Sequence, residues 1–379
     1  MKRFIKTYTR LISSLLLLGA SACDYIHDDS LPPCEFRLHY VYDYNMKFAD
    51  AFQHEVDQVT LFICNDQGVF LQQRQIEGDE LKTNDIRLDL SPGTYHLVSW
   101  AGLDDGTYRL PQLTPGTSSV EDIRVRTLRQ PDGTQPLELH PLWHSLDTIV
   151  VTGLAHEEQT IGLAKDTNKL RFVLQNVKGD NMDVNDFTFR IIADNGYMDY
   201  DNSLLSDPKI SYLPYYTENV EIAADPDPES TVSDQLVAVA EMNTMRLMAG
   251  ENYRLIVQHK GWEKDVLNIN LNNYLLLTKM EGHDISAQEY LDRQDEYSII
   301  FFLTPITCPD CPDPDPDPDP TPDPDPDPTP DPDPDPTPDP DPDPTPDPDP
   351  TPDPDPVIGY ACYTIQVKDW VIRLNETEL

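Results

Sequence analysis

Two cysteines near the end of the foldable sequence have the spacing of a reactive thiol pair. Cys308 and Cys311 form a Cys-Pro-Asp-Cys unit that directly follows the apolar stretch Ser298–Leu303. A redox motif of this spacing depends on a following helix, whose N-terminus lowers the pKa of the thiol. Pro312 and the proline repeat after it exclude such a helix. We therefore expect a structural disulfide or unreactive thiols here.

Two histidines have the spacing of helical zinc ligands. His140 and His144 are four residues apart, but Pro141 favours a loop, so we expect neither to bind a metal. The chain also lacks a Gly-x-Ser-x-Gly elbow, a phosphate-binding loop and a dinucleotide fingerprint. The sequence therefore gives no indication of an enzyme, a metal site or a cofactor.

The N-terminus has the features of an export signal that ends at a cysteine. Basic residues at positions 2, 3 and 6 precede the apolar run Leu11–Leu18, which is too short to span a bilayer. Small residues at positions 20–22 suit cleavage before Cys23, a pattern that resembles the lipobox of bacterial lipoproteins. We expect a signal peptide at 1–22, lipid on Cys23 and a tether at 23–33. The alternative is an ordinary secretory signal with an incidental cysteine.

The charge of the chain restricts its partners. The net charge is −41, and such an acidic surface repels nucleic acid and anionic lipid. We therefore expect no nucleic-acid partner, and we expect the two or three acyl chains on Cys23 to hold the protein to outer-membrane lipid. Acidic residues at positions 24, 28 and 29 are similar to those that accompany surface export in some anaerobic Gram-negative bacteria. The expected location is the cell outer membrane, with the body surface-exposed.

Apolar residues recur at every second position through much of the chain, as in half-buried β-strands. The clearest case is Cys34–Tyr44, in which every even position from Phe36 to Tyr44 is apolar. Polar turns separate many of the strands, and one short helix is predicted around Asp284–Arg293. This pattern predicts an all-β sandwich or barrel. The other predicted strands are Val56–Cys64, Thr94–Trp100, Leu170–Gln175, Phe187–Ile192, Tyr253–His259 and Val266–Leu271.

The length of the chain calls for two such units followed by a spacer. We place the boundary in the polar stretch Leu154–Gln159, which gives β-sandwiches at 34–156 and 157–308. Residues 309–356 are a Pro-Asp-Pro-Thr repeat, which cannot pack because proline removes backbone donors and unpaired aspartates cannot be buried. We expect an extended spacer, up to on the order of 150 Å long, without specific metal binding.

Residues 357–379 return to a foldable pattern. Two alternating runs predict a hairpin or one bent strand that ends the protein. The segment either folds back into its own domain or adds a strand to another molecule. The candidate strand-contact residues are Tyr363, Ile365, Val367, Trp370, Ile372 and Leu374.

Short matches over nearly the whole folded chain resemble the FimB-type fimbrial anchor lipoproteins. Each match is short, and their breadth makes the resemblance specific. They are Cys23 with Asp28-Asp29 and Pro32-Pro33-Cys34, then Tyr42–Met46, Phe52, Glu55–Leu61, Gly68, Pro92–Tyr95, Trp100–Gly102, Trp143–Ser145, Lys169–Phe172 and Trp370–Arg373.

The resemblance implies two tandem transthyretin-like β-sandwiches on a lipid tether, at the base of a type V pilus. In such pili an arginine-specific protease removes the first strand of each stalk subunit, and the next subunit's C-terminal strand fills the groove. Anchor subunits keep their first strand, end polymerisation and fix the fibre to the outer membrane. The Pro-Asp repeat ahead of the terminal strand departs from the usual pattern.

The leading hypothesis is a fimbrial anchor, with Phe36–Tyr44 as the retained first strand and Tyr363–Leu374 contacting the stalk subunit. The alternative for the last segment is that it completes its own sandwich and the repeat is an enlarged loop. A rival function is a surface glycan-binding lipoprotein, in which Trp100, Trp143 or Trp262 would stack on sugars. Tryptophans in strand patterns are, however, more often core residues. A hydrolase has no motif in its favour.

Overall fold

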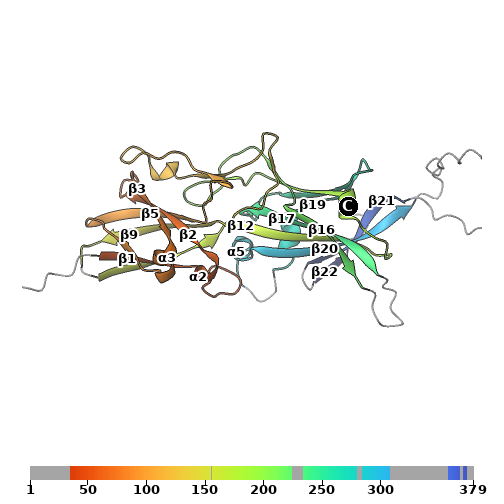
Figure 1. Cartoon of the computed structure of the whole chain (residues 1–379), viewed down its shortest axis with the longest axis horizontal. Helices are drawn as coiled ribbons and strands as arrows, with labels where there is room; N and C mark the ends of the chain where they lie inside the picture. The colour runs from red at the N-terminus through yellow and green to blue at the C-terminus, as the bar shows by residue number, and fades with distance from the viewer. Residues whose placement is uncertain are drawn as a thin grey trace, which may run out of the picture.

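The computed structural model describes residues 35–154, 156–223, 234–279, 284–307, 357–367 and 370–373. Its strands form two β-sandwiches that lie end to end along the long axis of the molecule (Figure 1). Every strand predicted from the alternating pattern is present, as is the predicted helix, so the all-β class is confirmed. Within the described residues, no helix has the length and apolar character needed to cross a membrane.

The N-terminal sandwich packs a three-stranded sheet, β10-β1-β4, against a five-stranded sheet, β11-β9-β5-β2-β3. Side chains from both inner faces, such as Leu38, Leu61 and Leu97, form one buried cluster. The elements are β1 (Glu35–Val41), α2 (Phe52–Glu55), β2 (Gln58–Asn65), β3 (Phe70–Glu77), α3 (Gly78–Thr83), β4 (Ile86–Leu88), β5 (Gly93–Ala101), β9 (Trp143–Val151), β10 (His156–Gly162) and β11 (Ala164–Lys165).

The C-terminal sandwich has a six-stranded sheet, β16-β17-β12-β20-β21-β22, and a five-stranded sheet, β19-β18-β13-β15-β8. Its elements are β8 (Thr134–Gln135), β12 (Thr167–Asn176), η2 (Val184–Asp186), β13 (Phe187–Ala193), β15 (Ile210–Tyr212), β16 (Tyr216–Ile222), β17 (Gln235–Met245), β18 (Arg254–His259), β19 (Asp265–Asn270), α4 (Leu271–Leu276), α5 (Ala287–Arg293), β20 (Glu296–Thr307), β21 (Val357–Val367) and β22 (Trp370–Arg373).

The change from one sandwich to the other occurs at Asp166, between β11 and β12. This is later than the boundary expected between residues 156 and 157. The polar stretch that suggested a linker is strand β10, which pairs in parallel with β1 along its whole length. Because β10 is an edge strand with mostly exposed side chains, its sequence is polar like that of a loop.

A long connection between neighbouring strands β5 and β9 joins the two sandwiches. Residues 103–142 carry β8, which pairs with β15, and the strands of a small sheet, β14-β7-β6. They also bury Phe62 and Trp100 on the outer face of the N-terminal sheet, in a cluster continuous with the C-terminal core. The connection contains β6 (Tyr108–Arg109), η1 (Val120–Asp122) and β7 (Val125–Thr127), and it pairs with β14 (Tyr197–Met198).

Candidate functional site

Strand β1 fills the middle of its sheet. All 7 of its residues pair in parallel with β10, and its first half also pairs antiparallel with β4. Phe36, Leu38 and Tyr40 point into the core and are at most 5% exposed. Burying these side chains contributes several kcal/mol, at roughly 1.5–3 kcal/mol for each large apolar group. The first sandwich is therefore closed by its own N-terminal strand.

Asn84 extends the pairing of β1 beyond the end of β4. Its Oδ1 accepts a hydrogen bond from the Tyr40 amide at 2.8 Å, and its Nδ2 donates to the Tyr40 carbonyl at 2.7 Å. Asn84 has a left-handed backbone with φ of 51°, which asparagine tolerates better than most residues. The side chain thus replaces one residue of a neighbouring strand.

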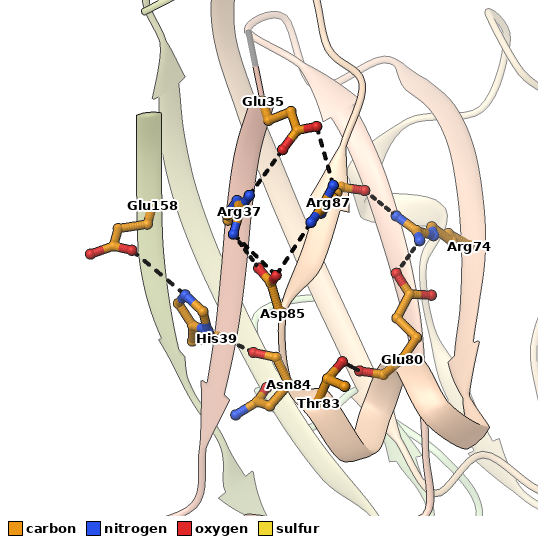
Figure 2. Close-up of polar contacts among 10 residues, drawn as sticks. All are labelled: Glu35, Arg37, His39, Arg74, Glu80, Thr83, Asn84, Asp85, Arg87 and Glu158. Carbon is orange, nitrogen blue, oxygen red and sulfur yellow. Dashed lines mark hydrogen bonds and ion pairs between the residues drawn. The ribbon is translucent and has the colours of Figure 1, made fainter. Parts of the chain in front are cut away.

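Charged side chains cover the solvent face of β1 (Figure 2). Arg37 lies 3.1 Å from both Glu35 and Asp85, and Arg87 lies 3.3 Å from Glu35. The Arg37 side chain is 33% exposed, so each pair contributes at most about 1 kcal/mol. Burial of the apolar face therefore contributes most of the stability of β1. The ion pairs join β1 to its neighbour β4.

The C-terminal segment forms a hairpin on the second sandwich. Strand β21 pairs antiparallel with β20, and Ile365, opposite Phe301, is completely buried. Among the described strands, β22 pairs only with β21 and forms the edge of the sheet. Of the candidate contact residues, three lie in β21 and two in β22; Leu374 is outside the described residues.

The Pro-Asp repeat connects two paired strands. Thr307, the last residue of β20, is the register partner of Val357, the first residue of β21. The repeat itself, 309–356, lies outside the described residues. Its two attachment points thus lie side by side at the end of the second sandwich remote from β1 (Figure 1).

The candidate histidines contact backbone carbonyls. His140 Nδ1 is 2.9 Å from the Gly102 carbonyl, and His144 Nε2 is 2.8 Å from the Tyr200 carbonyl. Burial lowers the pKa of His144 to about 4, so its ring is neutral at pH 7 and Nε2–H donates. No group of three or more metal-binding side chains occurs in the part of the chain that the structure describes.

The cysteines and tryptophans singled out in the sequence have different outcomes. Cys23, Cys308 and Cys311 lie outside the described residues, whereas Cys64 and Cys362 are buried. Trp100 and Trp143 are at most 1% exposed and cannot stack on a sugar. Trp262 is partly buried, with its ring stacked on His259 at a centroid distance of 3.9 Å.

A buried polar cluster at the junction of the sandwiches was missed by the sequence analysis. Asp166 is 1% exposed and accepts a hydrogen bond from Asn202 Nδ2 at 2.9 Å. Arg246 donates to the Asn202 carbonyl and makes two 2.8 Å hydrogen bonds with Asp292. Burial raises the pKa of Asp166 to about 7, against the lowering effect of Arg246. Because these residues are far apart in the chain, no local pattern could indicate their contact.

Comparison with protein families matches residues 31–320 to the fimbrillin-A associated anchor proteins Mfa1 and Mfa2. A search of curated proteins finds no significant match.

Solved structures share the fold. A Bacteroides thetaiotaomicron protein with a proposed polysaccharide-binding role is 31% identical, with a TM-score of 0.68 over 91% of this chain and 100% of that one. A proposed adhesin from the same organism is 28% identical, with a TM-score of 0.68 over 92% of this chain and 100% of that one. The fimbrial anchor protein Mfa2 of Porphyromonas gingivalis shares the fold at 12% identity, with a TM-score of 0.59 over 90% of this chain and 99% of that one. The chain therefore belongs to the family of fimbrillin-A associated anchor proteins.

Proposed function

We propose that this protein is an outer-membrane lipoprotein that anchors fimbriae and ends their assembly through strand-mediated contact with a stalk subunit. The observation that carries the proposal is the closed first sandwich, in which β1 pairs on both sides. A subunit whose groove is filled by its own strand offers no place for the strand of another subunit. Its role is structural rather than enzymatic.

The position of the arginines supports retention of β1. In the pili that the sequence resembles, an arginine-specific protease releases the first strand of stalk subunits. Here residues 42–57, which connect β1 to β2, contain no arginine. Arg37 lies within the paired strand, and the next arginine is Arg74 in β3. Because proteases cut exposed, extended segments, β1 is protected.

The stalk contact is assigned to the C-terminal hairpin. Strand β22 leaves one side of its backbone free for a further strand, since it pairs with β21 alone among the described strands. The candidates Tyr363, Ile365 and Val367 belong to β21, and Trp370 and Ile372 belong to β22. Contact requires either addition of a stalk strand to this edge or release of the hairpin from its own sheet.

Membrane attachment is tested in cells that assemble fimbriae. Cys23→Ser removes the acylation site, so we expect the protein and its fibres in the medium rather than in the outer-membrane fraction. Cys34→Ser changes a nearby cysteine and serves as the matched control, which should stay cell-bound. Fibres that remain attached to Cys23→Ser cells contradict the lipid anchor.

The strand contact is tested by ending the chain after Val367, which removes β22 and the residues beyond it. We expect an unchanged unfolding midpoint but loss of co-purification with the stalk subunit. Tyr216→Ala alters an exposed residue on β16, at the opposite edge of the same sheet, and should leave co-purification intact. Stalk binding by the truncated protein excludes β22 as the contact.

A second candidate function is glycan binding at the cell surface. It is favoured by the Bacteroides thetaiotaomicron relative, which is 31% identical and whose proposed role is polysaccharide binding. Because Trp100 and Trp143 are core residues, a sugar site would have to use other groups. Binding of soluble oligosaccharides, measured separately from fibre attachment, tests this function independently of the anchor role.

A further inference from the structure

A groove runs along the outer face of the N-terminal five-stranded sheet. Strands β2 and β3 form one wall, and residues 103–115, at the start of the long connection, form the other. Its volume is about 1130 Å³. Single small molecules typically occupy roughly 300–1,000 Å³, so this groove suits an extended ligand. It lies on the sheet opposite the one that contains β1.

The β3 wall is rich in glutamine. Strand pairing places Gln73 opposite Phe62 and Gln75 opposite Thr60, on one face of the sheet. Gln75 Nε2 donates to Gln58 Oε1 at 2.8 Å, and Thr60 Oγ1 donates to Gln75 Oε1 at 2.8 Å. Gln58 in turn donates to the Leu103 carbonyl on the opposite wall. These bonds hold the amides in place before any ligand arrives.

Other groups in the groove remain open to solvent. Gln73 and Gln112 are exposed on opposite walls, and Asp105 is exposed beside them. Leu110 and Leu113, on the wall formed by the long connection, are partly exposed and add apolar surface to the groove. The site therefore combines free amide and carboxylate groups with partly exposed apolar side chains.

This combination fits a neutral sugar polymer. Each amide offers both a donor and an acceptor, which matches hydroxyl groups that also do both. A carboxylate such as Asp105 accepts strong hydrogen bonds from hydroxyls. Among the described residues that line the groove, Arg109 is the single basic one, so a phosphate-rich or acidic polymer would meet little compensating charge. The partly exposed leucines suit contact with the carbon faces of sugar rings.

We propose that this groove binds an extended, uncharged oligosaccharide, with Gln73 and Asp105 contacting its hydroxyl groups. The proposal rests on the second candidate function and names its site. It leaves the anchor role untouched, because β1 and the C-terminal hairpin lie on other sheets.

The test uses the full-length protein in detergent and isothermal titration calorimetry. The probes are cellohexaose, maltohexaose, mannohexaose and laminarihexaose, with a heparin hexasaccharide as the acidic comparison. We expect saturable binding of at least one neutral probe and none of the heparin fragment. Gln73→Ala should weaken binding about three- to tenfold, the effect of losing one hydrogen bond, and Asp105→Ala at least as much.

Gln67→Ala is the matched control, since Gln67 is exposed in the turn before β3 and outside the groove. It should bind like the wild-type protein. Unfolding midpoints of all variants show whether weaker binding reflects lost folding.

Each failure has a separate meaning. No binding of any neutral probe overturns both the groove and the glycan function. Neutral binding that neither Gln73→Ala nor Asp105→Ala weakens overturns the groove but keeps the function. Preference for the heparin fragment overturns the assignment to uncharged sugars. Fibre attachment in cells, measured on the same variants, reports on the anchor role alone.

Discussion

Thr307 and Val357 are register partners in the β20–β21 hairpin, although the Pro-Asp repeat separates them in the sequence. The repeat therefore occupies the place of a hairpin turn. The terminal strand pairs within its own domain, because the residues that flank the repeat, Thr307 and Val357, lie opposite each other in the sheet.

Shortening the repeat tests this arrangement. Replacing residues 308–356 with a four-residue turn reduces the entropy cost of closing the hairpin, which falls by about 0.6 kcal/mol for each halving of loop length. We expect the free energy of unfolding to rise by about 2 kcal/mol in urea titrations. A Gly-Ser segment of the original length is the control and should behave like the wild-type protein. A lower unfolding midpoint in the shortened protein contradicts the hairpin.

Cys362 provides a reporter for docking of β21. Its thiol is buried opposite Leu303 in the sheet, so labelling requires the hairpin to open. In protein kept under reducing conditions, we expect peptide-resolved alkylation to modify Cys362 at least about 100-fold more slowly than in urea-unfolded protein. Cys64 is an internal reference, since burial raises the pKa of its thiol to about 11.

Rapid labelling of Cys362 with slow labelling of Cys64 would mean that β21 leaves its sheet readily. That outcome favours donation of the hairpin to a stalk subunit. Slow labelling of both thiols favours addition of a stalk strand to the free edge of β22.

Period-two patterning found strands such as β1, β12 and β13 because buried residues alternate with more exposed ones along each of them. In β1, for example, Phe36, Leu38 and Tyr40 are buried while Arg37 and His39 are not. The same rule missed β10, because an edge strand with exposed polar side chains has no apolar face. Strand β17, inside its sheet, was also not predicted, because most of its residues are buried on both faces and do not alternate.

Contacts between residues far apart in the chain could not be predicted from the sequence. Nothing in residues 103–142 indicates that β8 pairs with β15 of the other sandwich, since that pairing depends on the whole chain path. The contact of Asp166 with Asn202 is of the same kind. The alternative that the terminal segment folds onto its own domain was open, because strand alternation does not specify a partner.

The side chain of Asn84 is predicted to stabilise the position of β1. Asn84→Ala removes both side-chain hydrogen bonds to Tyr40 and places alanine in a left-handed conformation, so we expect a loss of about 2–4 kcal/mol. Asn84→Gly removes the same bonds without that strain and should cost about 1–2 kcal/mol less. Urea titrations measure the free energy, and hydrogen exchange at the Tyr40 amide measures the local effect.

Thr83→Ala is the control for this series. Thr83 is exposed and bonds only within the end of α3, so we expect a change below about 0.5 kcal/mol. Equal costs for the alanine and glycine variants would assign the whole effect to the side-chain bonds. Losses below 0.5 kcal/mol for both variants would exclude a stabilising role of Asn84 for β1.

Gly102 is predicted to hold the start of the long connection in place. It has φ of +77°, and a Cβ atom there would lie 2.0 Å from the Pro141 carbonyl oxygen. We therefore expect Gly102→Ala to cost about 3 kcal/mol or more in urea titrations. Gly116 has a similar φ of +73° but open space around it, so Gly116→Ala should cost only about 1 kcal/mol. Equal costs contradict a steric role for Gly102.

Two buried groups at the junction make opposing contributions to the pH dependence of stability. Burial raises the pKa of Asp166 from its ordinary value of 3.8 to about 7. The stability that the protonated carboxyl group contributes is therefore fully present below about pH 4 and is lost as the pH rises towards 7. Burial lowers the pKa of His144 to about 4. The stability that the neutral imidazole contributes is therefore fully present above about pH 6.5 and is lost as the pH falls towards 4. The two trends offset each other in the wild-type protein between about pH 4 and 6.5.

Asp166→Asn separates these contributions. Asparagine cannot ionise, so the stability of the variant relative to wild type should rise by up to about 4 kcal/mol between pH 4 and pH 7.5. Urea titrations at several pH values measure this difference, and Asp57→Asn, at an exposed aspartate, is the control that should show little change. A difference independent of pH would mean that Asp166 is already ionised at pH 4. In that case Arg246, whose opposing effect on this pKa comes second to burial, would be the dominant influence on the buried carboxyl group.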